Sequence, residues 1–480
     1  MTVFRRISHL FLFATAVIFA TPNSHAQTLI SSEEIDVIPA FLINILFNLP
    51  AQYDVQSYKL VYNTVDTQGE PTVASGMIAI PISTTCDIFP MAMYCHGTVL
   101  RQLDVPSENN FEALAAKGFA STGFITVAPD YLGLGVNAGN HPYVHAESQA
   151  TASVDLVYAA REFLETLDNM QDNGELFITG YSQGGHAAMA TLKYAQDNAL
   201  IDTLGIVAGA PCSGPYNLSG SQADVLLSGE PYSNPGYVVY LLIGYQLAYG
   251  NIYEDLSDII QSPYDTLVLP FFDGAQNEFN MDTVNAILPG ELDSLLVDSV
   301  LTNLETNDNH PIWQALRDND NYDWTPVMPL RLFYCDGDEQ VPFTNSTSTD
   351  SIMQANGAAD VQAIHALPGA THGGCILPAL QGANAFFISL ASPCGLVSSV
   401  QNAVEIKPLM ISPNPAKDFV QIPVAEAGAN ITIYNVSGKK VYQKQSNQST
   451  MQIDISALAS GLYVVLVQGE TVYGGKLIVQ

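Results

Sequence analysis

The sequence predicts an α/β protein with a doubly wound, mostly parallel sheet, an inserted cap and a small C-terminal β-sandwich. Strand-like and helix-like segments alternate along residues 55–213, which is typical of parallel strands joined by right-handed crossovers. The alternation stops over residues 214–329 and resumes at Leu330. Residues 403–480 differ from the rest in composition and consist of short runs of alternating apolar and polar residues.

Several of the expected strands are apolar throughout, as strands buried on both faces of a parallel sheet are. In chain order the expected strands are Tyr58–Asp66, Val73–Ile82, Met91–His96, Phe124–Asp130, Leu176–Gly180, Gly205–Ala210, Leu330–Cys335 and Val361–Leu367. Helices are expected over Ala146–Leu167 and Gly184–Ala199, and near Ile376–Ala391.

The segment 214–329 is rich in tyrosine and phenylalanine, and its stretch Tyr237–Tyr249 is mostly apolar and favours a helix. Structureless loops longer than about 15 residues are uncommon inside a compact domain. We therefore expect this segment to be a folded cap inserted between two strands of the sheet.

Charge separates the end of the chain from the rest. The whole chain carries a formal net charge of −32, residues 403–480 hold six lysines against five acids, and the first 26 residues hold two arginines. Residues 27–402 therefore carry −35. We expect a boundary between an α/β domain over residues 27–402, cap included, and a small domain over residues 403–480. The acidity repels polyphosphate, so no nucleic-acid partner is expected.

Residues 1–26 have the pattern of a secretory signal peptide. Arg5 and Arg6 precede the apolar run Leu10–Ala20, and Ser24 and Ala26 supply the small residues of a cleavage site. The run is too short to span about 30 Å of hydrocarbon, and no later run reaches about 18 apolar residues. We expect no transmembrane segment; the alternative for this region is an N-terminal anchor.

The segment Gly180–Gly184 fits G-x-S-x-G, with an apolar strand before it and a small-residue helix after it. A serine at such a turn has an exposed hydroxyl, and it becomes a nucleophile once a neighbouring base accepts its proton. Ser182 is therefore the expected nucleophile.

In this strand–turn–helix context the acid and then the base follow the serine along the chain. Three acids, Asp336, Asp338 and Glu339, come directly after the strand Leu330–Cys335. We favour Asp338 as the acid because it begins D-x-x-V-P. His372 lies in a glycine-rich loop and is the expected general base, whereas His365 lies within a strand and is expected to be a core or surface histidine.

A tetrahedral intermediate needs hydrogen-bond donors for its oxyanion. One is expected to be the backbone N–H of Gln183, the residue after the nucleophile. The other is expected to be the N–H of Thr98, because His96-Gly97-Thr98 follows an early apolar strand. His96 would then hold the loop in place. No cofactor and no metal are expected.

The six cysteines allow 15 complete pairings, and the sequence does not select among them. Cys95 and Cys335 end strand-like runs, so we expect them to be buried thiols. Cys212 and Cys375 both flank loops expected at the active site, so this pair is the first to test for a disulfide.

Five segments resemble the α/β-hydrolase superfamily and, within it, the cap-bearing secretory lipases and esterases. They are residues 96–98 (HGT), 128–135 (APDYLGLG), 180–185 (GYSQGG) and 338–342 (DEQVP), and the loop around His372. The resemblance spans residues 55–395 and implies a serine hydrolase acting on carboxylic esters. In the family the 128–135 loop lines the active-site region.

The tail resembles the type IX secretion C-terminal sorting domain. The matching segments are Ile411–Pro415, Ile431–Gly438, Leu458–Tyr463 and Lys476–Gln480. This resemblance implies export through Sec, passage across the outer membrane and a secreted or cell-surface location, with the type IX secretion machinery as partner.

The function expected from all of this is a secreted lipase or esterase that cleaves a small-molecule or lipid ester through an acyl-enzyme at Ser182. A secreted serine peptidase of the same fold is one alternative, because acids of the cap could bind a peptide amino terminus. A noncatalytic surface-binding protein on a hydrolase scaffold is another.

Overall fold

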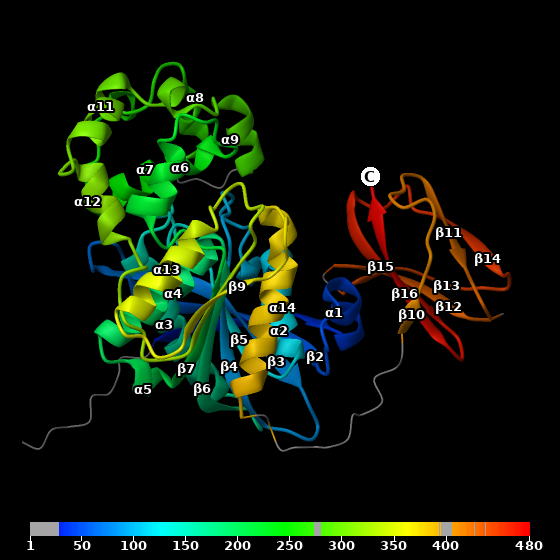
Figure 1. Ribbon diagram of the computed structural model, residues 1–480. Coiled ribbons are helices and arrows are strands. Elements are labelled where there is room, and N and C mark those ends of the chain that lie inside the picture. Colours follow the sequence, from blue (N-terminus) through cyan, green and yellow to red (C-terminus); the bar gives the residue numbers. More distant parts are fainter. Residues whose placement is uncertain (1–27, 273–279, 393, 395–405, 427, 437) are drawn as a thin grey trace, which may run out of the picture.

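The computed structural model describes residues 28–272, 280–392, 394, 406–426, 428–436 and 438–480 (Figure 1). The expected signal peptide, residues 1–26, lies outside the described residues. The same is true of residues 395–405, around the expected boundary at 402/403.

A nine-stranded sheet forms the centre of the larger part of the molecule, in the order β1-β2-β3-β5-β4-β6-β7-β8-β9. Strands β5 to β9 of this order pair in parallel, whereas β1, β2 and β3 pair antiparallel at one edge. The strands are Leu29–Ile38, Asp54–Val65, Pro71–Ile82, Ile88–Cys95, Ile125–Pro129, Gln171–Tyr181, Ile206–Cys212, Leu330–Tyr334 and Val361–His365, numbered β1 to β9. The expected mostly parallel sheet is confirmed.

Helices cover both faces of this sheet (Figure 1). One face packs against α3 (Ala146–Leu164), α4 (Gln183–Asp197) and α13 (Thr344–Ala355), with the short α5 (Ile201–Leu204) at its end. The other face packs against α1 (Ala40–Phe47), α2 (Phe111–Ser121) and α14 (His372–Leu390). The two hydrophobic cores that result hold the ends of the parallel strands rigidly.

Within the part of the chain that the structure describes, α14 is long and apolar enough to cross a membrane by length and composition. Its Ala379, Ala383 and Phe387 are fully buried in the core beneath the sheet. The core helix of a globular domain passes the same test.

The segment between β7 and β8 is helical and sits above the ends of the strands (Figure 1). Its longest helix, α7 (Pro235–Tyr249), begins two residues before the expected Tyr237 because Asn234 precedes a proline suited to the first helical turn. The other α-helices are α6 (Ala223–Leu226), α8 (Tyr264–Leu267), α9 (Met281–Ile287), α10 (Leu292–Leu295), α11 (Asp298–Thr306) and α12 (Pro311–Asp318). All of these except α6 contribute to one apolar core.

The C-terminal strands form two sheets around their own core. The five-stranded sheet has the order β10-β16-β15-β12-β13, and the two-stranded sheet pairs β11 with β14. The strands β10 to β16 are Ile406–Pro408, Phe419–Pro423, Asn430–Asn435, Lys440–Gln445, Thr450–Asp454, Gly461–Gln468 and Val472–Val479. This part packs on α1, where the rings of Phe41 and Tyr434 lie 5.6 Å apart in an edge contact.

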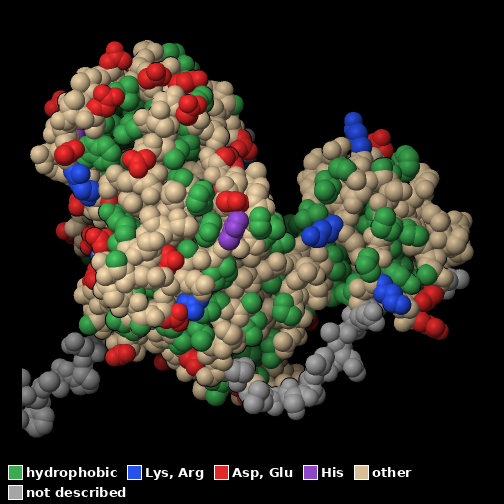
Figure 2. Space-filling model, in the orientation of Figure 1, with side chains coloured by type: hydrophobic (Ala, Val, Ile, Leu, Met, Phe, Trp, Pro, Cys, Tyr) green, Lys and Arg blue, Asp and Glu red, His purple; other side chains and the backbone are tan. Residues whose placement is uncertain are grey.

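The charge division expected from the sequence is visible on the surface. Acidic side chains are spread over the cap and the sheet domain, whereas basic side chains stand out on the C-terminal part (Figure 2).

Candidate active site

Ser182 lies at the sharp turn between β6 and α4, in a backbone conformation that few non-glycine residues adopt (φ 61°, ψ −121°). The turn is possible because Gly180 and Gly184 have no side chains: a Cβ on either would overlap backbone atoms of the neighbouring turn or of Cys95. The N–H of Ser182 donates to Cys212 O at 3.0 Å. The backbone therefore holds the serine at the carboxyl end of the sheet, as a nucleophile turn requires.

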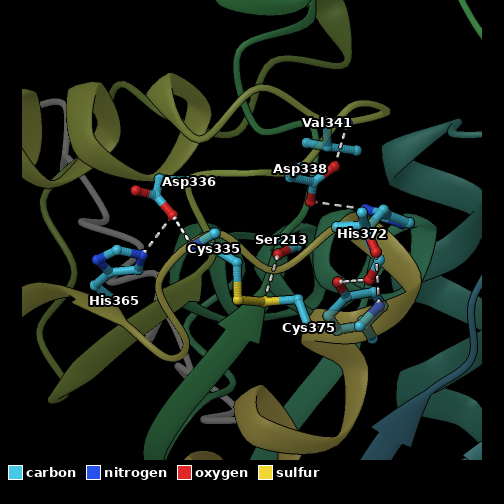
Figure 3. Close-up of a disulfide and its surroundings, with 12 residues drawn as sticks. Ser213, Cys335, Asp336, Asp338, Val341, His365, His372 and Cys375 are labelled. Atoms are coloured by element: carbon cyan, nitrogen blue, oxygen red, sulfur yellow. Dashed lines mark hydrogen bonds and ion pairs between the residues drawn. A yellow bond between two sulfur atoms is a disulfide. The ribbon is translucent and has the colours of Figure 1, made fainter.

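His372 and Asp338 form a buried pair, with Asp338 on the loop after β8 and His372 at the start of α14 (Figure 3). The ring Nδ1 of His372 lies 2.7 Å from Oδ2 of Asp338, and the side chains are 8% and 1% exposed. The other oxygen, Oδ1, accepts from the N–H groups of Gln340 and Val341. Since Nδ1–H donates to the carboxylate, Nε2 is the acceptor of the neutral ring.

Two further contacts hold His372. Its carbonyl accepts from the hydroxyl of Tyr181 at 2.6 Å, and its N–H donates to Glu339 at 3.1 Å. Burial acts to raise the pKa of Glu339, but its hydrogen bonds, led by the one from His372, outweigh burial and hold that pKa below its ordinary value. The three acids after β8 thus have distinct roles, and Glu339 is a support for the histidine backbone.

The third acid, Asp336, pairs with His365 (Figure 3), and both side chains are partly exposed to solvent. The expectation of a core or surface histidine at position 365 is confirmed: its side chain is 32% exposed. His372 differs slightly from expectation, because it is the first residue of α14 and not part of a loop. Thr371 accepts from the N–H of Gly374 and starts the helix at this point.

A disulfide joins the segments that carry Asp338 and His372 (Figure 3). Cys335 lies three residues before Asp338, Cys375 lies three residues after His372, and their Cα atoms are 5.9 Å apart. A second disulfide joins Cys86 to Cys394.

The expectations for Cys212 and for Cys335 are therefore wrong. Cys212 is a free thiol at the end of β7, and its Sγ donates to Ala210 O within its own strand. Cys335, expected as a free thiol, follows the next strand and meets Cys375 instead. Cys95 is a buried free thiol as expected, and burial raises its pKa to about 12.

The expected oxyanion residues lie beside Ser182. Gln183 is the first residue of α4, and Thr98 lies on the loop after β4. His96 holds that loop as expected: its ring, fully buried, bonds to Gly97 O at 2.7 Å and to Asp130 O at 3.2 Å. The Thr98 hydroxyl bonds to Tyr143 at 2.8 Å, so the loop is also tied to the base of the cap.

The structure adds two supporting residues: His141, which the sequence does not mark, and Asp130, which lies within the 128–135 segment but to which the sequence assigns no role. His141 bonds through Nδ1 to Leu132 O, and its Nε2 lies 2.7 Å from the side-chain nitrogen of Gln183. Burial lowers the pKa of His141 to about 3, so its ring is neutral and can accept from Gln183. Asp130, fully buried, accepts from both Ser75 and Ser107 and fixes the 128–135 loop.

Two cavities meet at Ser182. The cap cavity is almost wholly apolar: beside Ser182 and Gln183 it is lined by side chains such as Leu226, Leu241 and Trp313. The second cavity lies between α2 and α14, and Thr98, Ser182 and His372 line it together. Thr98, Ser182 and His372 therefore lie together, and Asp338 joins them through its bond to His372.

The chain is similar to proteins of known family or structure. Residues 49–255 match the chlorophyllase family model, a segment that contains Thr98, Ser182 and Gln183. The rice cell wall degrading esterase LipA from Xanthomonas oryzae is 27% identical, with 76% of this chain and 99% of that one covered and a TM-score of 0.68. A hydrolase from Legionella pneumophila is 28% identical over 76% and 98% of the two chains, with a TM-score of 0.68.

Candida antarctica lipase A shares the fold at 17% identity, with 75% of this chain and 83% of that one covered and a TM-score of 0.53. The chain belongs to the α/β-hydrolase superfamily and is a carboxylic ester hydrolase. Within that class it is similar to esterases, and it carries a C-terminal sorting domain of the secretion-system type.

Residues 410–480 match the secretion system C-terminal sorting domain model, which indicates export by type IX secretion to the cell surface or beyond. A curated relative, beta-agarase A from Zobellia galactanivorans, is 39% identical over 70 residues. The match covers 14% of this chain and 12% of the length of that protein.

Proposed function

We propose that the protein is an exported serine esterase that hydrolyses carboxylic esters of apolar acids through an acyl-enzyme at Ser182. The observation that carries the proposal is the buried Asp338–His372 pair, which opens into the same cavity as a serine on a strained strand-to-helix turn. These are the geometric roles of nucleophile, base and orienting acid.

In this mechanism Nε2 of His372 accepts the proton of the Ser182 hydroxyl as its oxygen attacks the ester carbonyl. Asp338 keeps the ring in the required tautomer through the 2.7 Å bond to Nδ1 and stabilises the imidazolium that forms. The N–H groups of Gln183 and Thr98 would donate to the oxyanion. His372 then protonates the leaving alcohol, and a water molecule, activated by the same ring, hydrolyses the acyl-enzyme.

The cap cavity is suited to the acyl chain. Its lining of leucine, valine and aromatic side chains offers an alkyl chain about 25 cal/mol for each Å² removed from water. The cap cavity begins at Ser182, so a chain bound there would place its carboxyl carbon at the serine. Apolar acids are therefore the acyl part that this site favours.

For export we propose that residues 1–26 are removed as a signal peptide after passage through Sec. Residues 403–480 then direct the folded hydrolase to the type IX machinery. The hydrolase consists of residues 27–402, including the cap at 214–329. The charge break between the two parts and the C-terminal match support this order.

Labelling by a fluorophosphonate probe tests the proposed nucleophile. The wild type should be labelled at one serine, Ser182→Ala should lose both labelling and p-nitrophenyl ester hydrolysis, and Ser389→Ala, an exposed serine on α14, should keep both. Labelling that survives in Ser182→Ala would contradict the proposal.

A further inference from the structure

The second cavity contains a carboxylate that the proposed triad does not use. Glu112 lies in the first turn of α2 and lines this cavity with Thr98, Ser182 and His372. The backbone there is fixed, because Asn110 accepts from the N–H groups of Glu112 and Ala113 and begins the helix. The carboxylate is therefore presented to the cavity by a rigid element.

One oxygen of Glu112 is occupied and the other is open. Oε2 accepts from the hydroxyl of Tyr94 at 2.7 Å. Oε1 has no hydrogen bond or ion pair to any residue in the part of the chain that the structure describes. A side chain at Gly97 would begin 3.8 Å from this oxygen, which places Oε1 beside the loop that carries Thr98.

Other polar groups of the second cavity are already engaged. Gln381 donates to Phe47 O, and Asn384 donates to Thr122. Thr98 bonds to Tyr143. Glu112 thus offers an acceptor next to the reacting centre that is both charged and available.

We propose that the second cavity binds the alcohol part of the ester and that Oε1 of Glu112 accepts a hydrogen bond from a donor on it. This inference rests on the proposed function. It assigns the substrate class as esters of an apolar acid with an alcohol that carries a further hydroxyl or an ammonium group. Burying such a group costs free energy unless a partner replaces its water, and a carboxylate is a strong partner.

The two cavities then divide the substrate by polarity. The cap cavity has a hydrocarbon wall and suits the acyl chain, whereas the charge of Glu112 favours donors and repels anionic groups in the second cavity. An ester whose alcohol part carries a phosphate should therefore be a poor substrate.

The test compares three esters of one acid: the ethyl ester, the glyceryl monoester and the 3-dimethylaminopropyl ester. For Glu112→Ala we expect kcat/KM on the donor-bearing ester to fall about tenfold to a hundredfold, with less than a twofold change on the ethyl ester. Glu112→Gln keeps an acceptor for Tyr94 and for a hydroxyl but loses the charge. Compared with Glu112→Ala, this variant should show a smaller fall in kcat/KM on the glyceryl ester and nearly the same fall on the ammonium ester.

Glu165→Gln, an exposed acid at the end of α3, removes the same charge away from both cavities and should change none of the three rates. Equal losses on all three esters in the Glu112 variants would show that Glu112 only holds Tyr94, and no loss on either donor-bearing ester would also overturn the inference. A wild type that cleaves no ester and takes no fluorophosphonate label would instead contradict the proposed function.

Discussion

Near the ends of β8 and β9 lie two Asp–His pairs that are alike in composition and different in setting. Asp338 with His372 and Asp336 with His365 lie within a few residues of each other, at 2.7 Å and 3.0 Å (Figure 3). The first pair is 1% and 8% exposed and opens into the cavity of Ser182, whereas the second is 46% and 32% exposed. Residue type and spacing do not separate them.

What separates them is the surroundings. Asp338 is enclosed by backbone donors and a histidine that is itself held by Tyr181 and Glu339. His365 instead stacks flat on Tyr334, with ring centroids 5.1 Å apart, on the outside of the sheet. A carboxylate and an imidazole act as a catalytic unit only where the fold excludes water and presents a nucleophile.

The largest expected effect is the difference between Asp338→Asn and Asp336→Asn. An asparagine at 338 can donate to Nδ1 and so favours the wrong tautomer, for which serine hydrolase triads lose about 10⁴-fold in kcat. Asp336→Asn changes only an exposed pair, and its kcat should stay within about twofold. Steady-state kinetics on a p-nitrophenyl ester measure both. Comparable losses in the two variants would remove the distinction between the pairs.

The next largest expected effect concerns the Cys335–Cys375 disulfide, which joins the segment of the two aspartates to the segment of His372. Replacing Cys335 and Cys375 by alanine frees the segments that carry Asp338 and His372, and misplacement by about 1 Å can cost about a hundredfold in rate. The matched control replaces Cys86 and Cys394. Each double variant should lose about 2–5 kcal/mol of unfolding free energy, but only the first should lose kcat.

Urea denaturation and kcat, measured well below both unfolding midpoints, separate the two effects. If both double variants lose stability and neither loses kcat, the disulfide near the site stabilises the fold without positioning the pair.

Much of the site could be predicted from the sequence because its residues belong to short local patterns. Gly180–Gly184 forms its turn from local backbone geometry, and Asp338 and His372 follow strands that end at one edge of the sheet. Asp336 and Asp338 could be ranked only by the D-x-x-V-P pattern. The structure gives the physical reason for this ranking, because the backbone N–H groups of Gln340 and Val341 donate to Asp338.

The parts that were missed depend on contacts between distant segments. The preference for Cys212 over Cys335 as the disulfide partner of Cys375 is wrong, because both lie at strand ends on the same edge and only side-chain direction decides between them. Strand β1 was missed because it is an exposed edge strand rich in acids and has no apolar alternation. Nothing local marks Glu112, whose position at the cavity depends on the packing of α2 against the sheet.

The smallest expected effect is the pH dependence of the exposed pair. The pKa of Asp336 lies below its ordinary value, chiefly because Gly369 N–H donates to it; desolvation opposes this shift, and the interaction with His365 adds to it. A carboxyl with a lowered pKa stabilises the fold above its unfolded-state pKa, near 4, and loses that contribution as pH falls through its folded-state pKa. Asp336→Asn should therefore lower Tm slightly at pH 7, and the Tm difference from the wild type should shrink below about pH 4.

Thermal unfolding of the wild type and of Asp336→Asn from pH 7 to pH 2 measures this difference. A Tm difference that stayed constant over that range would mean that Asp336 stabilises the fold through packing alone and not through its charge. The two Asp–His pairs would then differ in the type of interaction as well as in burial.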